Sequence, residues 1–225
     1  MDKYTADTDK CKASGPVKIA VTGGIGSGKS VVCRMLTEKG LPVVSADELS
    51  RRAVEPGTPA YGQIVEYFGE SILLPDGNID RPALRNLIRS DPEAKKALES
   101  FIHPEVFRQM EKRAEKAAQK EAVAVVMEVP LLFESGMEKW FDCVVLVYTS
   151  VEGRIGRIIA RDGVSREEAI SMIKIQMPEE MKRKQAHRVI DNDGPMEETR
   201  WSVDRLYDRI MEKAEANTRK KNENG

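Results

Sequence analysis

The sequence predicts an α/β fold of three layers, in which helices cover both faces of a five-stranded parallel sheet. Short β-rich runs alternate with long helical patterns along the chain, which is typical of parallel sheets. Two of these runs, 123–127 and 143–147, are apolar throughout, as strands covered on both faces should be. A glycine-rich loop at 23–28 lies directly between the first run and the first helical pattern.

Five strands are expected, with helices between them. Their approximate positions are 17–22, 42–45, 122–127, 143–148 and 187–191. The interval between the second and third strands is too long for one crossover helix, so about 56–121 is predicted to be a helical insertion. A second insertion-like helical region, about 154–184, follows the fourth strand.

Apolar residues recur at helical spacing on both sides of Pro104, in the predicted insertion. They are Ala94, Ala97, Leu98, Phe101 and Ile102 before it, and Val106, Phe107, Met110 and Ala114 after it. Because proline disfavours helical geometry in the preceding residue, we expect His103 to leave the helix. Pro104 would then lie in the first turn of a second helix.

Composition limits the kinds of partner. The chain has 225 residues, 40% of them hydrophobic and 32% charged, which suits one large globular domain with insertions. Its net charge is −1 and no dense basic cluster occurs, so no nucleic-acid partner is expected. No run of 18 apolar residues occurs, so no membrane span is expected. The polar ends, 1–16 and 217–225, are expected to be poorly ordered.

The three cysteines are far apart and show no metal-binding spacing. Cys33 and Cys143 fall in apolar segments, where a buried free thiol is the usual interpretation. The first residues resemble neither a secretory signal nor a transit peptide. We therefore expect a reducing compartment and a cytoplasmic location.

The residues from Gly23 to Ser30 form the pattern Gly-x-x-x-x-Gly-Lys-Ser, between a predicted strand and a predicted helix. The glycines let successive N–H groups and the helix N-terminus face phosphate oxygens. Lys29 would reach the β- and γ-phosphates, and the Ser30 hydroxyl would ligate Mg²⁺. The sequence therefore predicts a P-loop NTPase-type fold that binds a nucleotide.

Two carboxylates follow predicted strands on the side where this loop lies. Asp47 could accept a proton from an attacking hydroxyl or bind Mg²⁺ through water, but it could equally cap the next helix. Glu128 could hold Mg²⁺ or its waters, or have a capping or ion-pair role. The sequence leaves both alternatives open.

Arg154, Arg157 and Arg161 recur at i, i+3 and i+7 and therefore share one helix face. Arginines on a mobile helix can neutralise charge on transferring phosphates, although most such stripes are only solvated. His103, which precedes a proline, is more often structural than catalytic. His187 begins a strand without an evident partner, and we assign it no role.

Taken together, these segments resemble the dephospho-CoA kinase family. The matching elements recur in order: Thr22 to Ser30, Ala46-Asp47, Val54-Glu55-Pro56-Gly57, Asp76-Gly77, His103-Pro104, Val129 to Glu134, Arg161-Asp162, Gln176, and Ile190 to Gly194. They extend over about 17–213, which is nearly the whole chain. The resemblance implies transfer of the γ-phosphoryl group of ATP to the ribose 3′-hydroxyl of dephospho-CoA.

The resemblance also implies an organisation and a set of roles. The kinase domain would span 17–216, with a CoA-binding insertion at about 56–121 and a lid at about 154–184. Catalysis would use Asp47 as the base, with Lys29, Arg157 and Arg161 offsetting charge. The expected ATP contacts are Gly24, Ile25, Gly26, Ser27, Gly28, Lys29, Ser30, Val31 and Asn192, and the acceptor contacts are His103, Pro104, Leu131, Leu132 and Glu134. Mg²⁺ would be held by Ser30 and Asp47, and a monomer is expected.

Two other functions remain open from the sequence. Another P-loop kinase, acting on a nucleoside monophosphate or a sugar, would share the loop and the lid. It would not account for His103-Pro104 or for 130–134. A nucleotide-gated regulatory module is the alternative from another class, but the Asn-Lys-x-Asp segment that reads guanine in GTPase switches does not occur.

Overall fold

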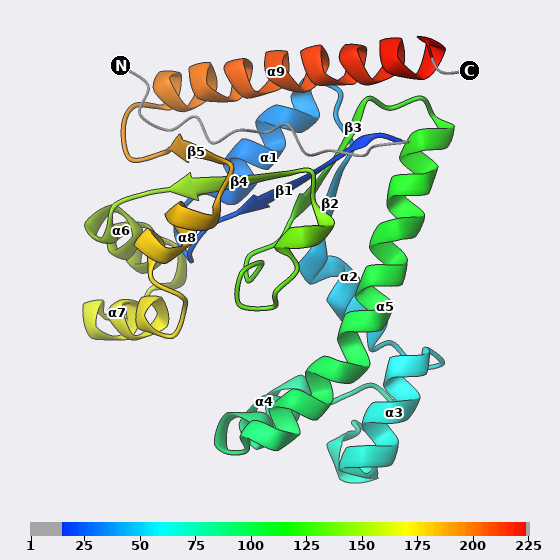
Figure 1. The fold of residues 1–225 in the computed structure, drawn as a ribbon. Coiled ribbons are helices and arrows are strands. Elements are labelled where there is room, and N and C mark those ends of the chain that lie inside the picture. Colours follow the sequence, from blue (N-terminus) through cyan, green and yellow to red (C-terminus); the bar gives the residue numbers. More distant parts are fainter. Residues whose placement is uncertain (1–14, 224–225) are drawn as a thin grey trace. The chain divides into compact units, whose positions relative to one another are not determined.

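A five-stranded sheet forms the centre of the first of two structural units in this computed structural model (Figure 1). The structure describes residues 15–223, and it describes side chains for 15–216 except residue 90. The strand order is β2-β3-β1-β4-β5, and the β1–β3, β1–β4 and β4–β5 pairs are parallel. The strands are β1 (Val17–Thr22), β2 (Val43–Ser45), β3 (Ala124–Glu128), β4 (Cys143–Tyr148) and β5 (Arg188–Asp191). The predicted α/β fold is confirmed.

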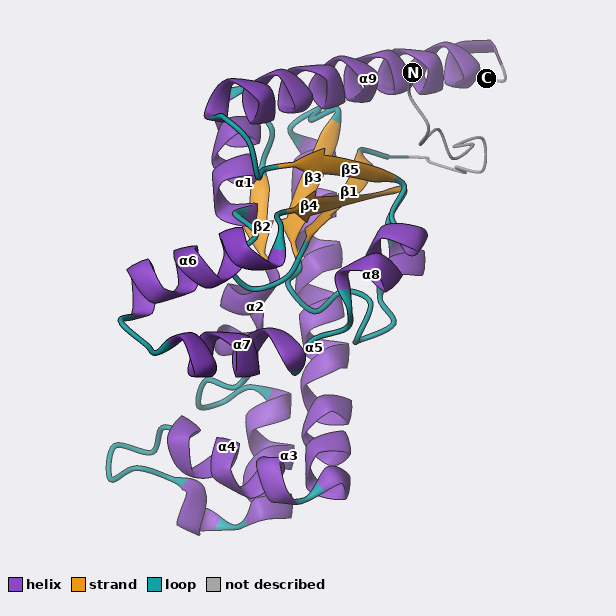
Figure 2. Ribbon diagram, turned by 90° about the vertical axis from the view of Figure 1, so that its left-hand side faces the viewer, coloured by secondary structure: helices purple, strands orange, loops and turns teal. Residues whose placement is uncertain are grey.

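Both faces of the sheet are buried. One face packs against α1 (Lys29–Glu38) and α9 (Met196–Glu223), which lie on the same side of the sheet (Figure 2). Its core contains alternate strand residues together with apolar residues of the two helices: Ile19, Val21, Val126, Val145, Val147, Val32, Leu36, Val203, Leu206 and Ile210. The residues that alternate with these, such as Ala20, Met127 and Leu146, are also fully buried. Burial on both sides explains why the strands are continuously apolar.

Residues 45–113 form the second unit, whose regular elements are all helical. It contains α2 (Ala46–Ala53), α3 (Pro59–Phe68), a 3₁₀ turn (Glu70–Ile72), α4 (Arg81–Ser90) and most of α5 (Pro92–Gln119). Its buried core consists of Val54, Ile64, Ile72, Ile79, Leu84 and Leu98. The unit begins and ends earlier in the chain than the insertion expected at about 56–121.

The predicted helix break before Pro104 is wrong, because α5 continues through this proline for a total length of 28 residues. A proline inside a helix removes one backbone hydrogen bond and crowds the preceding turn. Here the apolar face outweighs that cost: Leu98, Val106 and Met110 are buried at helical spacing before and after the proline. His103 therefore stays within the helix and is half-buried.

Three helices follow β4 in the region expected to form a lid. They are α6 (Val151–Asp162), α7 (Arg166–Lys174) and α8 (Glu179–Gln185). The α7 helix begins with a capping box between Ser165 and Glu168. Ile155 and Ile158 of α6 pack against Ala169 of α7, and Ile25 of the glycine-rich loop joins this apolar cluster.

The structure describes part of each chain end. The α9 helix continues to Glu223 and so includes 217–223 of the polar C-terminal end. Most of the N-terminal extension predicted at 1–16 lies outside the described residues. Within the described part of the chain, no helix is both long and apolar enough to cross a membrane.

His187 has a partner that the sequence did not reveal. Its ring Nδ1 accepts a hydrogen bond of 2.8 Å from the backbone N–H of Val144. The backbone N–H of His187 donates to the Val144 carbonyl at 2.9 Å. Burial lowers the pKa of His187, and the positive charges of Lys213 and Arg188 lower it further. The neutral imidazole that accepts the Val144 hydrogen bond is therefore favoured in the folded chain.

We expect His187 to make the fold less stable in mild acid. Its pKa is lower in the folded chain than in the unfolded chain, so its stabilising contribution is complete above about pH 6.5 and is lost as the pH falls toward the folded value. Urea unfolding between about pH 8 and 5 should therefore show a smaller pH dependence in His187→Gln, which cannot titrate. Identical pH dependences in the two proteins would contradict this assignment.

Candidate active site

The glycine-rich loop between β1 and α1 has a backbone that only glycine can adopt at its critical positions. Gly28 has φ +91°, in the left-handed region, and a β-carbon there would clash with the side-chain amide of Asn192. Gly23 has φ +151°, and a β-carbon there would clash with the Val147 carbonyl. The glycines of the sequence pattern are therefore required both by backbone conformation and by close packing.

The carbonyl of Ser27 is held from behind the loop by three side chains. It accepts hydrogen bonds from Thr149 Oγ1 at 3.0 Å, from Asn192 Nδ2 at 2.8 Å and from Arg157 Nη1 at 3.2 Å. Asn192 is itself fixed, since its Oδ1 accepts from Thr199 Oγ1 at 2.9 Å. In a trans peptide the C=O and N–H groups point in opposite directions, so the Gly28 N–H points away from these side chains.

Lys29 and Ser30 occupy the first turn of α1, directly after this peptide. The Lys29 ammonium donates to the carbonyl oxygens of Gly23 and Gly24 at 2.9 and 3.2 Å, so its side chain folds back along the loop. Ser30 is exposed and is available to a ligand. A lysine, a hydroxyl and main-chain amides at a helix N-terminus form an anion-binding arrangement.

The structure separates the three arginines of α6. Arg157 contacts the loop, donating to Ser27 and also to the carbonyl of Asn192. Arg161 instead forms a two-pronged ion pair with the neighbouring Asp162 and is exposed. Arg154, which shares their helix face, is buried with only 3% of its surface exposed.

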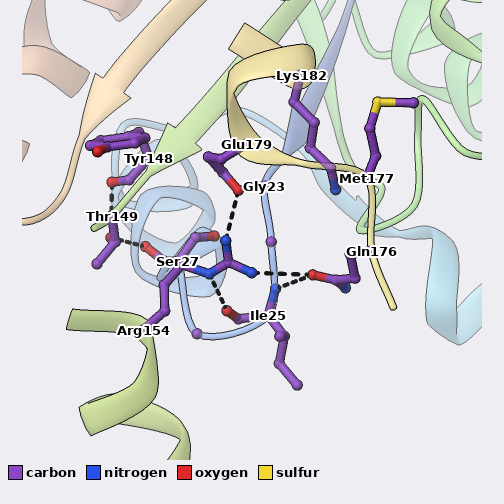
Figure 3. Close-up of polar contacts among 12 residues, drawn as sticks. Gly23, Ile25, Ser27, Tyr148, Thr149, Arg154, Gln176, Met177, Glu179 and Lys182 are labelled. Carbon is purple, nitrogen blue, oxygen red and sulfur yellow. Dashed lines mark hydrogen bonds and ion pairs between the residues drawn. The ribbon is translucent and has the colours of Figure 1, made fainter. Parts of the chain in front are cut away.

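A segment of the predicted lid to which the sequence analysis assigned no site residue also contacts the loop. The side-chain oxygen of Gln176 accepts from the Ile25 N–H at 2.8 Å, and Arg154 Nε donates to the Ile25 carbonyl at 2.8 Å (Figure 3). Glu179, three residues further on, pairs with Arg154 at 2.9 Å. We call residues 176–182 the strap. No spacing in the sequence indicates these contacts, because they join residues about 130 to 150 positions apart.

The strap also binds the segment after β3. Lys182 is fully buried and pairs with Glu134 at 2.8 Å, and the Met177 N–H donates to the same carboxylate at 3.0 Å. Burial alone would raise the pKa of Glu134, but the hydrogen bonds from Lys182 and Met177 hold it below its ordinary value. In the same segment Leu131 is exposed and Leu132 is fully buried.

Asp47 and His103 belong to the second unit. Asp47 lies in the first turn of α2 and is exposed. The helix cap is Ser45, whose hydroxyl accepts from the Glu48 N–H at 3.3 Å, so the capping interpretation of Asp47 is wrong. His103 is half-buried and Pro104 is exposed in α5.

The donor groups proposed for Mg²⁺ suit that ion. Mg²⁺ prefers oxygen ligands and usually keeps several waters, with one or two protein ligands and substrate phosphates. Ser30 offers a hydroxyl and Asp47 a carboxylate, and both residues are exposed. No group of three or more His, Cys, Asp or Glu residues suited to holding a metal occurs within the described residues.

The fold and the loop together define a P-loop phosphotransferase. The family model described as dephospho-CoA kinase matches residues 17–198, and the chain belongs to that family. The expected family is thereby confirmed.

Individual relatives agree with this assignment. A dephospho-CoA kinase of Shouchella clausii is 42% identical over 88% of this chain and 99% of its own length. One of Geobacter metallireducens is 42% identical over 87% and 97%. A crystal structure of a Thermus thermophilus protein matches with a TM-score of 0.76 and 40% identity, covering 87% of this chain and 98% of that one. Dephospho-CoA kinase from Campylobacter jejuni matches with a TM-score of 0.64 and 28% identity, covering 89% and 98%.

We expect Glu134→Leu to destabilise the chain more than Lys182→Met. Removing Glu134 leaves a fully buried ammonium without its carboxylate, which costs on the order of 3 kcal/mol. Removing Lys182 leaves a carboxylate that is 23% exposed and still accepts from Met177. Denaturant unfolding measures both losses.

Glu38→Gln is the matched control for this comparison. Its ion pair with Arg200 has both side chains more than half exposed, so the loss should be below about 1 kcal/mol. Equal losses of stability in Glu134→Leu and Lys182→Met would contradict the expected difference between the two variants.

Proposed function

We propose that this chain transfers the γ-phosphoryl group of ATP to the ribose 3′-hydroxyl of dephospho-CoA, giving coenzyme A. The observation that carries this proposal is the phosphate loop, built on main-chain amides within a family match that spans 17–198. The proposed reaction is a phosphoryl transfer between two small molecules, for which a protein mainly positions the reactants and offsets charge.

The donor side of the proposal rests on the loop and its neighbours. The N–H groups of Gly26, Gly28, Lys29 and Ser30 would bind the phosphates, because those of Ile25, Ser27 and Val31 already donate to Gln176, Gly24 and Gly28. The Lys29 ammonium would leave the loop carbonyls to contact the phosphates. Arg157 already lies on the loop and would offset charge on the transferring group. For Arg161 to act similarly, it must exchange its ion pair with Asp162 for the phosphates. Asn192, an expected ATP contact, would act at least by fixing Ser27.

The acceptor side of the proposal rests on Asp47, on His103 with Pro104, and on the segment 131–134. Asp47 would accept the proton of the ribose hydroxyl, and its exposure leaves the carboxylate available for that role. His103 and Pro104 would contact the acceptor. Leu131 is the exposed member of its segment, whereas Leu132 and Glu134 would act mainly by shaping it.

Mg²⁺ is the proposed cofactor, held by Ser30 and Asp47. When bound, it would neutralise charge shared between the β- and γ-phosphates. We also propose a monomer that acts on small molecules and not on nucleic acid. A cytoplasmic location stays a prediction from the sequence.

An ADP-release assay with dephospho-CoA as acceptor, followed by the mass of the product, tests the proposed function. We expect ADP and one added phosphoryl group on dephospho-CoA, and no transfer to nucleoside monophosphates or sugars. Transfer to one of those acceptors instead would favour the other P-loop kinases. Slow ATP hydrolysis that no pantetheine-containing ligand changes would favour a nucleotide-gated module.

We expect Asp47→Asn to lower turnover by a factor of about 10² or more while leaving ATP affinity nearly unchanged, because the amide cannot accept the proton. Steady-state kinetics and ATP binding measure the two effects separately. Glu48→Gln is the control: Glu48 is the next residue of α2 and pairs with Arg52 at the surface. Normal turnover in Asp47→Asn would remove Asp47 from the reaction.

A further inference from the structure

Arg154 is a lid residue whose charged end lies against the phosphate loop rather than in solvent. It comes from α6, and Figure 3 shows its guanidinium between Ile25, Gln176 and Glu179. Only 3% of its surface is exposed. A guanidinium cannot give up its proton in a protein, so this is a permanently charged group at a buried position.

The loop residue Ile25 has both of its backbone polar groups bound by this cluster. Its N–H donates to Gln176 Oε1 at 2.8 Å, and its carbonyl accepts from Arg154 Nε at 2.8 Å. Arg154 Nη2 lies 3.4 Å from the same Gln176 oxygen, which joins the two contacts. The Ile25 side chain packs on Ile155 and Ile158 of α6. Backbone and side chain of this turn are therefore fixed by the lid together.

The same guanidinium packs closely against Gly24. Its φ lies outside the left-handed region, so its backbone conformation does not require glycine. A β-carbon at Gly24, however, would clash with the Cζ and Nη2 atoms of Arg154. The second glycine of the loop is therefore needed to admit this lid arginine against the main chain.

Burial of the charge is compensated by Glu179, which pairs with Arg154 at 2.9 Å and is itself 11% exposed. Burial raises the pKa of Glu179, while the charges of Arg154, Lys182 and Lys29 oppose that rise. Desolvation makes a buried ion pair a weak source of net stability, so stability alone does not explain its presence beneath the loop. The contacts to Ile25 and Gly24 give the pair a further role.

We propose that Arg154 is a positioning residue for nucleotide binding, which with Glu179 and Gln176 clamps the Gly24–Ile25 turn so that the amides after it face the phosphates. Nε, Nη1 and Nη2 of the guanidinium are engaged by the protein, so Arg154 acts through the loop and not by touching ATP. The inference rests on the proposed function only in requiring that the loop binds ATP.

Three variants separate positioning from stability. Arg154→Leu leaves Glu179 buried without its partner, so we expect lower stability and at least tenfold weaker binding of a non-hydrolysable ATP analogue. Arg154→Leu with Glu179→Leu removes both charges, so we expect stability to recover while affinity stays weak. Arg154→Lys can still pair with Glu179 but cannot reach Ile25 and Gln176 at once. We expect it to keep most of the stability and to lose affinity.

Calorimetric binding of the analogue, without acceptor, and denaturant unfolding are the two measurements. Arg166→Gln is the matched control, because Arg166 pairs with Glu152 within the same lid and both side chains are more than half exposed. It should change the affinity by no more than about twofold and leave the denaturation midpoint nearly unchanged.

Recovery of affinity together with stability in the double variant would reduce Arg154 to a structural ion pair and overturn the proposal. Unchanged affinity in Arg154→Leu would overturn it as well. If Arg154→Leu fails to fold, the double variant and Arg154→Lys still decide. A wild-type chain that binds the analogue but does not phosphorylate dephospho-CoA would overturn the proposed function alone. A wild-type chain that does not bind the analogue would overturn both the proposed function and the role of Arg154.

Discussion

The candidate site depends on hydrogen bonds that neighbouring side chains donate to the carbonyl oxygens of the phosphate loop. Ser27 is bound from the ends of β4 and β5, through Thr149 and Asn192, and Ile25 is bound from α6 by Arg154. Because each peptide is planar, a carbonyl fixed toward the protein directs the next N–H away from it. These side chains therefore help to orient the backbone amides that would bind phosphate.

The sheet order explains why these side chains meet at the loop. β1, β4 and β5 are parallel neighbours, so the segments after their carboxyl ends lie at one edge of the sheet. Thr149 directly follows β4 and Asn192 directly follows β5, while the loop follows β1. A polar residue one position past β4 and one past β5 thus help to hold the loop. Apolar packing on the α1 and α9 face fixes the strands that carry these residues.

Features set by local pattern could be predicted from the sequence, and features set by distant contacts could not. Continuous apolar runs predicted the strands, and the loop pattern predicted the positions of Lys29 and Ser30, because each of these features depends on neighbouring residues. The break at Pro104 was wrong, since burial of a shared apolar face outweighs the local preference of proline. The buried state of Lys182 was not predictable, because its carboxylate partner lies on a separate element.

The strap connects two parts of the candidate site that lie far apart along the chain. At its first residue, Gln176 binds the loop through Ile25; at its last, Lys182 binds Glu134 in the segment after β3. Between them, Glu179 neutralises the lid arginine. A displacement of this short segment would therefore disturb both the loop and the segment after β3, since the strap binds each of them by directional contacts. The loop and the segment after β3 are thus connected through one stretch of seven residues.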